Sequence, residues 1–416
     1  MKKNNLIQYI LIPHHNLFLL FFIFPLSILI GNFAININLL IISLTFLFYL
    51  ITKQIDNIFQ NKVFILLVLF LISLIINVIF SYDPLLSLPR VIKVGLIIFF
   101  IFSFRCCLLN LDNNHMQKLY TTWSIIFAFV TFDLIFEFFN GKNIMGLVSI
   151  MPGFRLGSFT GEESVIGNYF SGFVLIFLSC FYKTFYNKRY LNLLISLFLI
   201  IISFVIGERA NFLKTFIIIT LFYFFIYDFK IKTKFFFFVT AFSLLLIVLN
   251  SNSYYKYRYY EQIKSNFKGG GIYTYLDNSV YGAHYNVASE IFKDNPFFGV
   301  GIKNFRNQSV KNKYQNLPHR FNQLRSSTHP HQVHYEFLSE TGLFGYLSFL
   351  LFIFLSLYWS IKNYFINKNI YQFSSILFVL VSLLPIIPGG SFFSTFTSSI
   401  FWLNYAIMVG YNDLKS

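Results

Sequence analysis

Residues 62–81 read KVFILLVLFLISLIINVIFS, an almost unbroken apolar run with one lysine at its start. A helix needs about 20 apolar residues to cross the hydrocarbon core of a bilayer, so this run alone predicts a membrane span. Of the 416 residues, 56% are hydrophobic and only 12% are charged. Soluble domains carry about 25% charged residues. The sequence therefore predicts an all-α integral membrane protein and argues against a soluble enzyme.

Similar apolar runs occur along the whole chain. By the same length rule about twelve transmembrane helices are expected, near residues 16–33, 35–52, 62–81, 90–109, 117–139, 165–182, 190–206, 210–228, 234–250, 343–361, 371–388 and 393–412. Residues 251–342 contain no span and form one long loop with helical signals between helices 9 and 10. We thus expect a membrane domain over 1–250 (about nine helices), a large external loop over 251–342, and a second membrane part over 343–416 (about three helices).

The net charge of +16 is spread over the short gaps between apolar runs rather than gathered in one tract. This pattern favours orientation in a membrane over nucleic-acid binding. Fifteen basic residues, including Lys2, Lys3 and Lys415, fall on one predicted side. The short gaps on the other side hold Arg90, Lys142, Arg155 and Arg209. The positive-inside rule then predicts that both termini are cytoplasmic and that the long loop is external.

Three polar clusters fall on the external side: RLGSFTGEE at 155–163, GERAN at 207–211 and STHPHQVHYE at 327–336. Their agreement suggests a single site. An arginine at a membrane boundary, such as Arg209 or Arg155, is costly unless it is paired or faces a polar cavity. Arg209 either pairs with Glu208 or reaches water as a purely structural residue, or it binds an anionic group through its planar guanidinium. The same two readings apply to Arg155.

The histidines of the third cluster admit three readings. His329, His331 and His334 are a weak zinc candidate, because no fourth ligand is evident and the three cysteines lie in apolar stretches. An imidazole also titrates near neutral pH and suits a general base. The third reading is structural, with a histidine capping a helix that begins near Gln332.

Two further features have mainly structural readings. Asp133 and Glu137 are four residues apart and share one helix face, where structural or site-lining roles are expected. Aromatic and basic residues alternate over 254–260, which is typical of an interfacial aromatic belt or of a surface on which sugar rings stack.

Residues 329–345, HPHQVHYEFLSETGLFG, closely resemble the His-Pro-His-Asn-x3-Glu-x-Leu-x-Glu-x-Gly-x2-Gly signature of the O-antigen ligase and O-antigen polymerase superfamily. Residues 295–305, NPFFGVGIKNF, are similar to that family's Asn-Pro-x2-Gly-x-Gly-x3-Phe element. The segments 207–210 and 155–169 also resemble family motifs. The resemblance covers roughly residues 120–390. It departs from the family at Gln332, where asparagine is usual.

The resemblance implies an inverting membrane glycosyltransferase without metal or other cofactor. The family transfers a glycan from undecaprenyl diphosphate to an acceptor hydroxyl at the periplasmic face of the bacterial inner (cytoplasmic) membrane. By motif position, His331 is expected to position or deprotonate the acceptor, and Arg209 and then Arg155 to bind the diphosphate. The further expected site residues are Glu163, Arg325, His329, His334 and Gln332. The implied partners are the carrier-linked glycan, a lipid A-core or second glycan acceptor, and membrane lipid, with no nucleic acid.

The favoured function is that of a ligase, which attaches glycan to a lipid A-core sugar. A polymerase that joins carrier-linked repeat units differs only in its acceptor and stays open. A transporter or flippase is a more distant alternative, because the halves of the chain show no repeat symmetry. A membrane scaffold or polymer-length regulator would not need arginines and histidines on one face.

Overall fold

The computed structural model describes residues 13–55, 58–152, 154–316, 319–321, 324–385 and 387–414. Within these residues the regular structure is helical and contains no strand. Nine helices of the described chain are long and apolar enough to cross a membrane. The predicted all-helical, multi-pass architecture is thus confirmed, whereas the count of twelve spans is not. Lys2, Lys3 and Lys415 lie outside the described residues.

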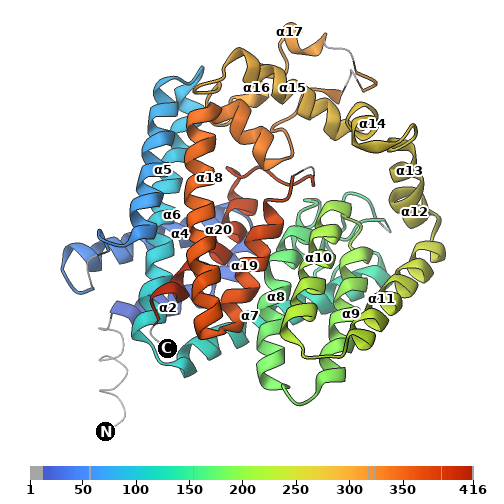
Figure 1. Cartoon of the computed structure of the whole chain (residues 1–416), viewed down its shortest axis with the longest axis horizontal. Helices are drawn as coiled ribbons and strands as arrows, with labels where there is room; N and C mark the ends of the chain where they lie inside the picture. The colour runs from blue at the N-terminus through green and yellow to red at the C-terminus, as the bar shows by residue number, and fades with distance from the viewer. Residues whose placement is uncertain are drawn as a thin grey trace.

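The helices follow one another with mostly short connections (Figure 1). The helices before residue 252 are α2 (Pro13–Phe22), α3 (Phe24–Ile30), α4 (Asn32–Ile51), α5 (Lys62–Ile79), α6 (Pro84–Asn110), α7 (Asn113–Asn140), α8 (Ile166–Thr184), α9 (Arg189–Val205), α10 (Arg209–Ile226) and α11 (Ile231–Ser251). Short elements follow: α12 (Ser253–Lys256), the π-helix η2 (Tyr257–Glu261), α13 (Gln262–Asn266), α14 (Gly271–Asn278), α15 (Val280–Asp294), α16 (Phe305–Gln308) and α17 (Asn312–Gln315). The last are α18 (Val333–Asn367), α19 (Ile370–Ser382) and α20 (Thr395–Gly410).

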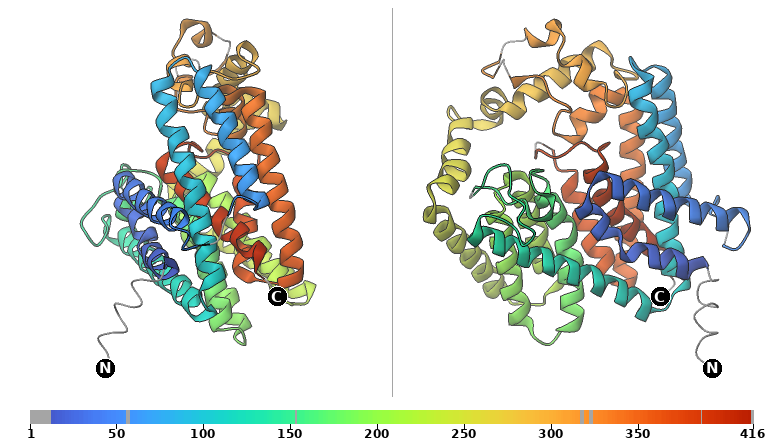
Figure 2. Two further views of the ribbon diagram at one scale, coloured as in Figure 1. Left: turned by 90° about the vertical axis from the view of Figure 1, so that its left-hand side faces the viewer. Right: turned by 180° about the vertical axis from the view of Figure 1, so that it is seen from behind.

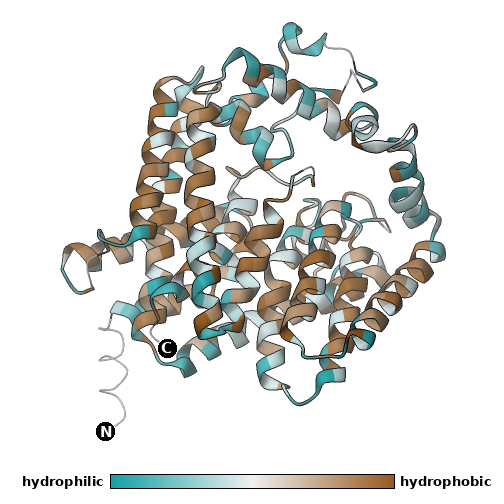
Figure 3. Ribbon diagram, in the orientation of Figure 1, coloured by the Kyte–Doolittle hydropathy of each residue, from teal (hydrophilic) through white to brown (hydrophobic). Residues whose placement is uncertain are grey.

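The short elements α12 to α17 form an arch that runs over one end of the membrane helices from α11 to α18 (Figure 1). The arch is mostly hydrophilic, whereas α5 and the long part of α18 are strongly hydrophobic (Figure 3). At the opposite end of the bundle, Arg105 at the end of α6 pairs with Asp413 over 2.5 Å. Seen from the rear, the helices α2 to α4 cross in front of this bundle (Figure 2).

Two predicted spans differ from the observed helices at positions next to prolines. The first is divided at Ile23, just before Pro25 in the first turn of α3. The helix α19 ends at Ser382, short of the predicted limit at residue 388. Pro385 and Pro388 follow, and neither has a backbone N–H to continue a helix. A loop therefore replaces the end of this predicted span.

The helix α18 is broken at Gly342, whose φ of +64° lies outside the helical region. The N–H of Leu343 donates to the carbonyl of Pro296 over 2.8 Å, and that of Phe344 to Phe297 over 3.1 Å. A β-carbon on Gly342 would lie 2.4 Å from the carbonyl carbon of Phe297. The break thus makes room for the segment 295–305 against the helix.

Hydrogen bonds to the backbone of residues 295–305 hold this segment on both sides. The N–H of Gly301 donates to the carbonyl of Glu340 over 2.8 Å. On the other side, the Asn77 amide of α5 donates to the carbonyl of Phe298 over 2.6 Å. This motif therefore anchors the arch to α5 and α18, and so fixes where the residues of the arch lie relative to the membrane helices.

Candidate functional site

A cavity of about 880 Å³ lies between the arch and the helices α8, α10, α11, α19 and α20. Its walls come from distant parts of the sequence: residues 155–171, 204–214, 242–249, 258–281, 329–333 and 378–401. One part of the wall carries arginines and histidines, and another carries the apolar side chains of α11. All three predicted polar clusters contribute residues to this one cavity.

Arg209 is the first residue of α10, and it lines the cavity. It follows Gly207, where φ is +82° and a β-carbon would lie 2.6 Å from the carbonyl oxygen of Phe154. The Arg209 guanidinium donates to the carbonyl of Arg258 over 3.2 Å. No carboxylate of the described residues lies within ion-pair distance of Arg209. The local pair with Glu208, one of the two readings of the sequence, is not formed.

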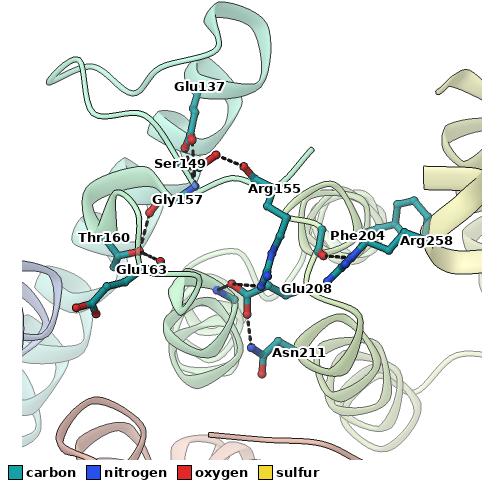
Figure 4. A network of polar contacts seen from close by, with 12 residues as sticks. Glu137, Ser149, Arg155, Gly157, Thr160, Glu163, Phe204, Glu208, Asn211 and Arg258 are labelled. Atoms are coloured by element: carbon teal, nitrogen blue, oxygen red, sulfur yellow. Dashed lines mark hydrogen bonds and ion pairs between the residues drawn. The ribbon is translucent and has the colours of Figure 1, made fainter. Parts of the chain in front are cut away.

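Glu208 instead contacts three other groups (Figure 4). Its carboxylate accepts hydrogen bonds from the Asn211 amide over 2.5 Å and from the N–H of Gly167 over 3.2 Å. A guanidinium nitrogen of Arg155 lies 4.0 Å away. Burial raises the pKa of Glu208, and Arg155 and the two hydrogen bonds oppose that effect. Glu208 thus orients Arg155, which also lines the cavity.

Arg258 is a cavity residue that the sequence did not single out. It lies in the π-helix η2, and its guanidinium donates to the carbonyl of Gly207 over 2.9 Å. The neighbouring Tyr259 stacks on Phe204 at 4.1 Å between ring centroids and donates to that residue's carbonyl. The aromatic residues of 254–260 therefore attach the arch to the end of α9. The alternation of charge and aromatic residues was visible in the sequence, but it did not indicate which cation faces the site.

His331 lines the same cavity in a backbone conformation unusual for histidine, with φ of +61°. Its carbonyl accepts a hydrogen bond from the N–H of Gly389 over 2.7 Å. Its Nε2 lies 3.2 Å from the Ser327 hydroxyl. Burial and the nearby His284 lower the pKa of His331 to about 4. The imidazole is therefore neutral at pH 7, with a lone pair available to accept a proton.

Two more histidines surround His331. The ring centroid of His329 lies 4.0 Å away, and that of His284 lies 5.2 Å away in a stacked arrangement. Burial also lowers the pKa of both, with His331 adding to the effect on His329. His284 was not predicted, because it lies in α15, 47 residues before His331. Among the described residues, no group of three or more His, Cys, Asp or Glu is arranged to hold a metal ion.

The remaining four predicted site residues do not line the cavity. Gln332 is the N-cap of α18 and accepts from the N–H groups of His334 and Tyr335. Both ring nitrogens of His334 are engaged, with the Leu383 carbonyl and the Tyr346 hydroxyl, each at 2.9 Å. We therefore expect structural roles for Gln332 and His334.

Arg325 and Glu163 are also placed away from the cavity wall. Arg325 is fully buried and donates to the carbonyl of Tyr314 over 3.1 Å, a contact that links two segments of the arch. Glu163 is exposed, and its side chain is directed away from Arg155 (Figure 4). The structure therefore places neither residue in the wall of this cavity.

The carboxylates of α7 have structural partners. Asp133 accepts from the Ser158 hydroxyl over 2.5 Å and from the N–H of Ile144 over 2.9 Å. Glu137 accepts from the N–H groups of Gly157 and Ser158. The two side chains therefore shape the connection that leads to Arg155.

A second hydrogen-bond network supports the backbone at His331. Glu336 accepts from the N–H of Phe392 over 2.7 Å and from the Ser391 hydroxyl. The Lys303 ammonium donates to the same hydroxyl over 2.5 Å. Residues 389–392 are thereby fixed, and they include the Gly389 N–H that binds the His331 carbonyl. The position of the His331 backbone therefore depends on Glu336, on Lys303 and on the loop after α19.

Residues 192–350 match a family model described as O-antigen ligase. The match runs from α9 into α18, and it contains Arg209, Arg258 and His331. It confirms the predicted resemblance to the O-antigen ligase and polymerase superfamily over this part of the chain. Among curated proteins, none matches the sequence.

Proposed function

We propose that this O-antigen ligase-like membrane protein transfers a glycan from undecaprenyl diphosphate to an acceptor hydroxyl, with a lipid A-core sugar as the preferred acceptor. The reaction would take place at the periplasmic face of the bacterial inner membrane and would invert the anomeric centre. The observation that carries the proposal is the cavity itself. Arg155, Arg209, Arg258 and His331 reach it from four different segments, next to an apolar wall.

The arginines suit a diphosphate leaving group. In the proposed step the acceptor oxygen bonds to the anomeric carbon, and the bond from that carbon to the diphosphate oxygen breaks. The electron pair of this bond stays on the diphosphate, so negative charge develops there. Guanidinium groups bind phosphate oxygens in pairs, and fixed donors at the position of developing charge lower the barrier. Arg209 and Arg258 are the proposed donors.

His331 is suited to accept the proton of the acceptor hydroxyl. Its imidazole is neutral because burial and His284 lower its pKa. A bound diphosphate would raise this pKa again, because an anion stabilises the imidazolium. His331 would thus become a stronger base when the donor is present. His329 lies against it, and its Nδ1 lies 2.9 Å from the Thr328 hydroxyl.

The apolar wall suits the polyprenyl chain. It includes Phe242, Leu245, Leu246 and Leu249 of α11. Aliphatic and aromatic side chains of this kind are compatible with any lipid tail, so they support the class of donor and not its length.

Glycolipid analysis of a deletion strain tests the function. A ligase deletion should leave carrier-linked glycan chains with nothing attached to the lipid A-core. A polymerase deletion should leave single repeats attached and so change the length distribution. Unaltered glycolipids, with an unaltered pool of carrier-linked chains, would contradict both versions of the proposal.

A further inference from the structure

Lys214 is a cation of the cavity that neither the sequence motifs nor the proposed chemistry uses. It lies in α10, five residues after Arg209, and it lines the cavity. Its Nζ lies 3.1 Å from the point that a β-carbon on Gly389 would occupy. The side chain therefore reaches towards the loop that holds His331, and not out along the surface of the helix.

The Lys214 ammonium has no hydrogen bond or ion pair with any residue that the structure describes. A lysine inside a membrane-spanning helix is costly unless it has a partner or reaches water. Since its ammonium faces the cavity, the missing partner is expected to be something that enters the cavity.

The charges of the cavity wall favour an anion. Among the described lining residues the cations are Arg155, Arg209, Lys214 and Arg258, and the only carboxylate is Glu208. Glu208 lies beside Arg155. The other three cations have no carboxylate partner within the described chain. An anion with two or more charges would compensate them.

Arg209 and Lys214 lie at different heights along α10, and this indicates how the anion is oriented. A helix rises about 1.5 Å per residue, so Lys214 lies about 7.5 Å further along the axis than Arg209. The two side chains therefore reach the cavity at different depths. Arg209 and Arg258 meet at the end of the helix near the arch, and Lys214 lies on the part of the wall that continues into the membrane.

We propose that Lys214 binds the lipid-side phosphate of the carrier diphosphate, while Arg209 and Arg258 bind the glycan-side phosphate. This inference rests on the proposed function. It makes Lys214 the residue that distinguishes a diphosphate carrier from a monophosphate carrier, because a monophosphate bound at the two arginines would not reach it.

Equilibrium binding to the full-length protein in detergent tests this assignment, with sugar-free undecaprenyl diphosphate and undecaprenyl monophosphate as probes. A charge-assisted hydrogen bond contributes about 1.5–3 kcal/mol. Lys214→Met should therefore weaken diphosphate binding about 10–100-fold and change monophosphate binding less than about threefold. Lys214→Arg should keep most of the preference. Lys232→Met is the matched control, since Lys232 is exposed and lies outside the cavity wall, and it should bind both lipids as the wild type does.

The possible outcomes separate the two proposals. If the wild type prefers the diphosphate and Lys214→Met keeps that preference, the role of Lys214 is wrong and the proposed function stands. An equal loss for both lipids would also overturn the role of Lys214. If the wild type binds neither lipid, the proposed function itself is contradicted. Melting temperature checks the fold of the variant, which should be at least as stable as the wild type because an unpaired charge is removed from a span.

Discussion

The guanidinium of Arg209 donates to the backbone carbonyl of Arg258 over 3.2 Å, although 49 residues separate the two in the chain. Arg258 in turn donates to the carbonyl of Gly207 over 2.9 Å. Each arginine is therefore held by backbone next to the other, with no carboxylate of the described residues between them. Two cations fixed in this way stabilise an anion that lies between them, and neither needs to change its position to do so.

Arg209→Ala should lower the transfer rate at least about 100-fold, because two charge-assisted hydrogen bonds to phosphate are lost. Arg209→Lys should recover only part of the rate, since an ammonium cannot make the paired contacts of a guanidinium. Transfer by purified protein in proteoliposomes measures both variants. Full activity of Arg209→Ala in folded protein would remove this residue from the site.

Arg258→Ala should reduce transfer to a similar extent, although the residue stands in no motif of the sequence. Lys256→Ala is the matched control, because Lys256 lies in the same short helical stretch and is exposed. Equal activity of the two variants would mean that the arch contributes only general positive charge.

The activity of the wild type should respond to pH through His331. Since its pKa is lowered to about 4 from the usual 6.5, the neutral form persists well below pH 6.5. We expect kcat/KM to change little between pH 7 and about pH 5.5 and to fall at lower pH, because kcat/KM reports the free enzyme. His331→Ala should abolish transfer across the range. An acid limb near pH 6.5 in the wild type would contradict a buried, neutral imidazole.

Stability should also depend on pH through the histidine cluster. His284, His329 and His331 all have lowered pKa values, so between about pH 4 and 6.5 the unfolded chain binds protons that the folded protein does not. Stability must therefore rise with pH across this window and level off above it. Melting temperatures in detergent measure the slope. His329→Gln should flatten it, and an unchanged slope would show that other groups cause the effect.

Gly299→Ala should destabilise the protein by about 2–4 kcal/mol. The backbone φ of Gly299 is +66°, and a β-carbon there would lie 2.5 Å from the carbonyl carbon of Glu340. Gly270→Ala is the control for φ alone, since φ is +92° and nothing lies within 4 Å of the added carbon. Gly270→Ala should cost about 1 kcal/mol. Similar losses for both variants would mean that the contact with α18 is not tight.

The membrane helices were predictable because their signal is local. A run such as 62–81 is long and apolar enough to identify a span without any knowledge of its neighbours. The break in α18 at Gly342 was not predictable, because the reason for it is the segment 295–305 that packs there. Pro385 and Pro388 do indicate that α19 ends early. The apolar residues around them nevertheless extended the predicted span to residue 388.

The site was predictable only in part, since a motif identifies residues and not their partners. Arg155, Arg209, His329 and His331 do line one cavity. His334 and Gln332 stand within the same motif but have structural contacts. Gln332 caps α18, and His334 makes hydrogen bonds with the Leu383 carbonyl and the Tyr346 hydroxyl. The folding of the arch brings Arg258 to the cavity and His284 against His331, which no local pattern in the sequence describes.

The hydrogen bond from Gly389 to the His331 carbonyl limits how this protein can be divided for study. An excised fragment of residues 251–342 would carry every histidine of the cluster, yet it would lack the connection between the last two helices that holds the strained backbone at φ +61°. Antibodies or inhibitors selected against such a fragment would meet an imidazole in some other orientation. Screens that aim at this histidine therefore require the entire chain embedded in lipid or detergent.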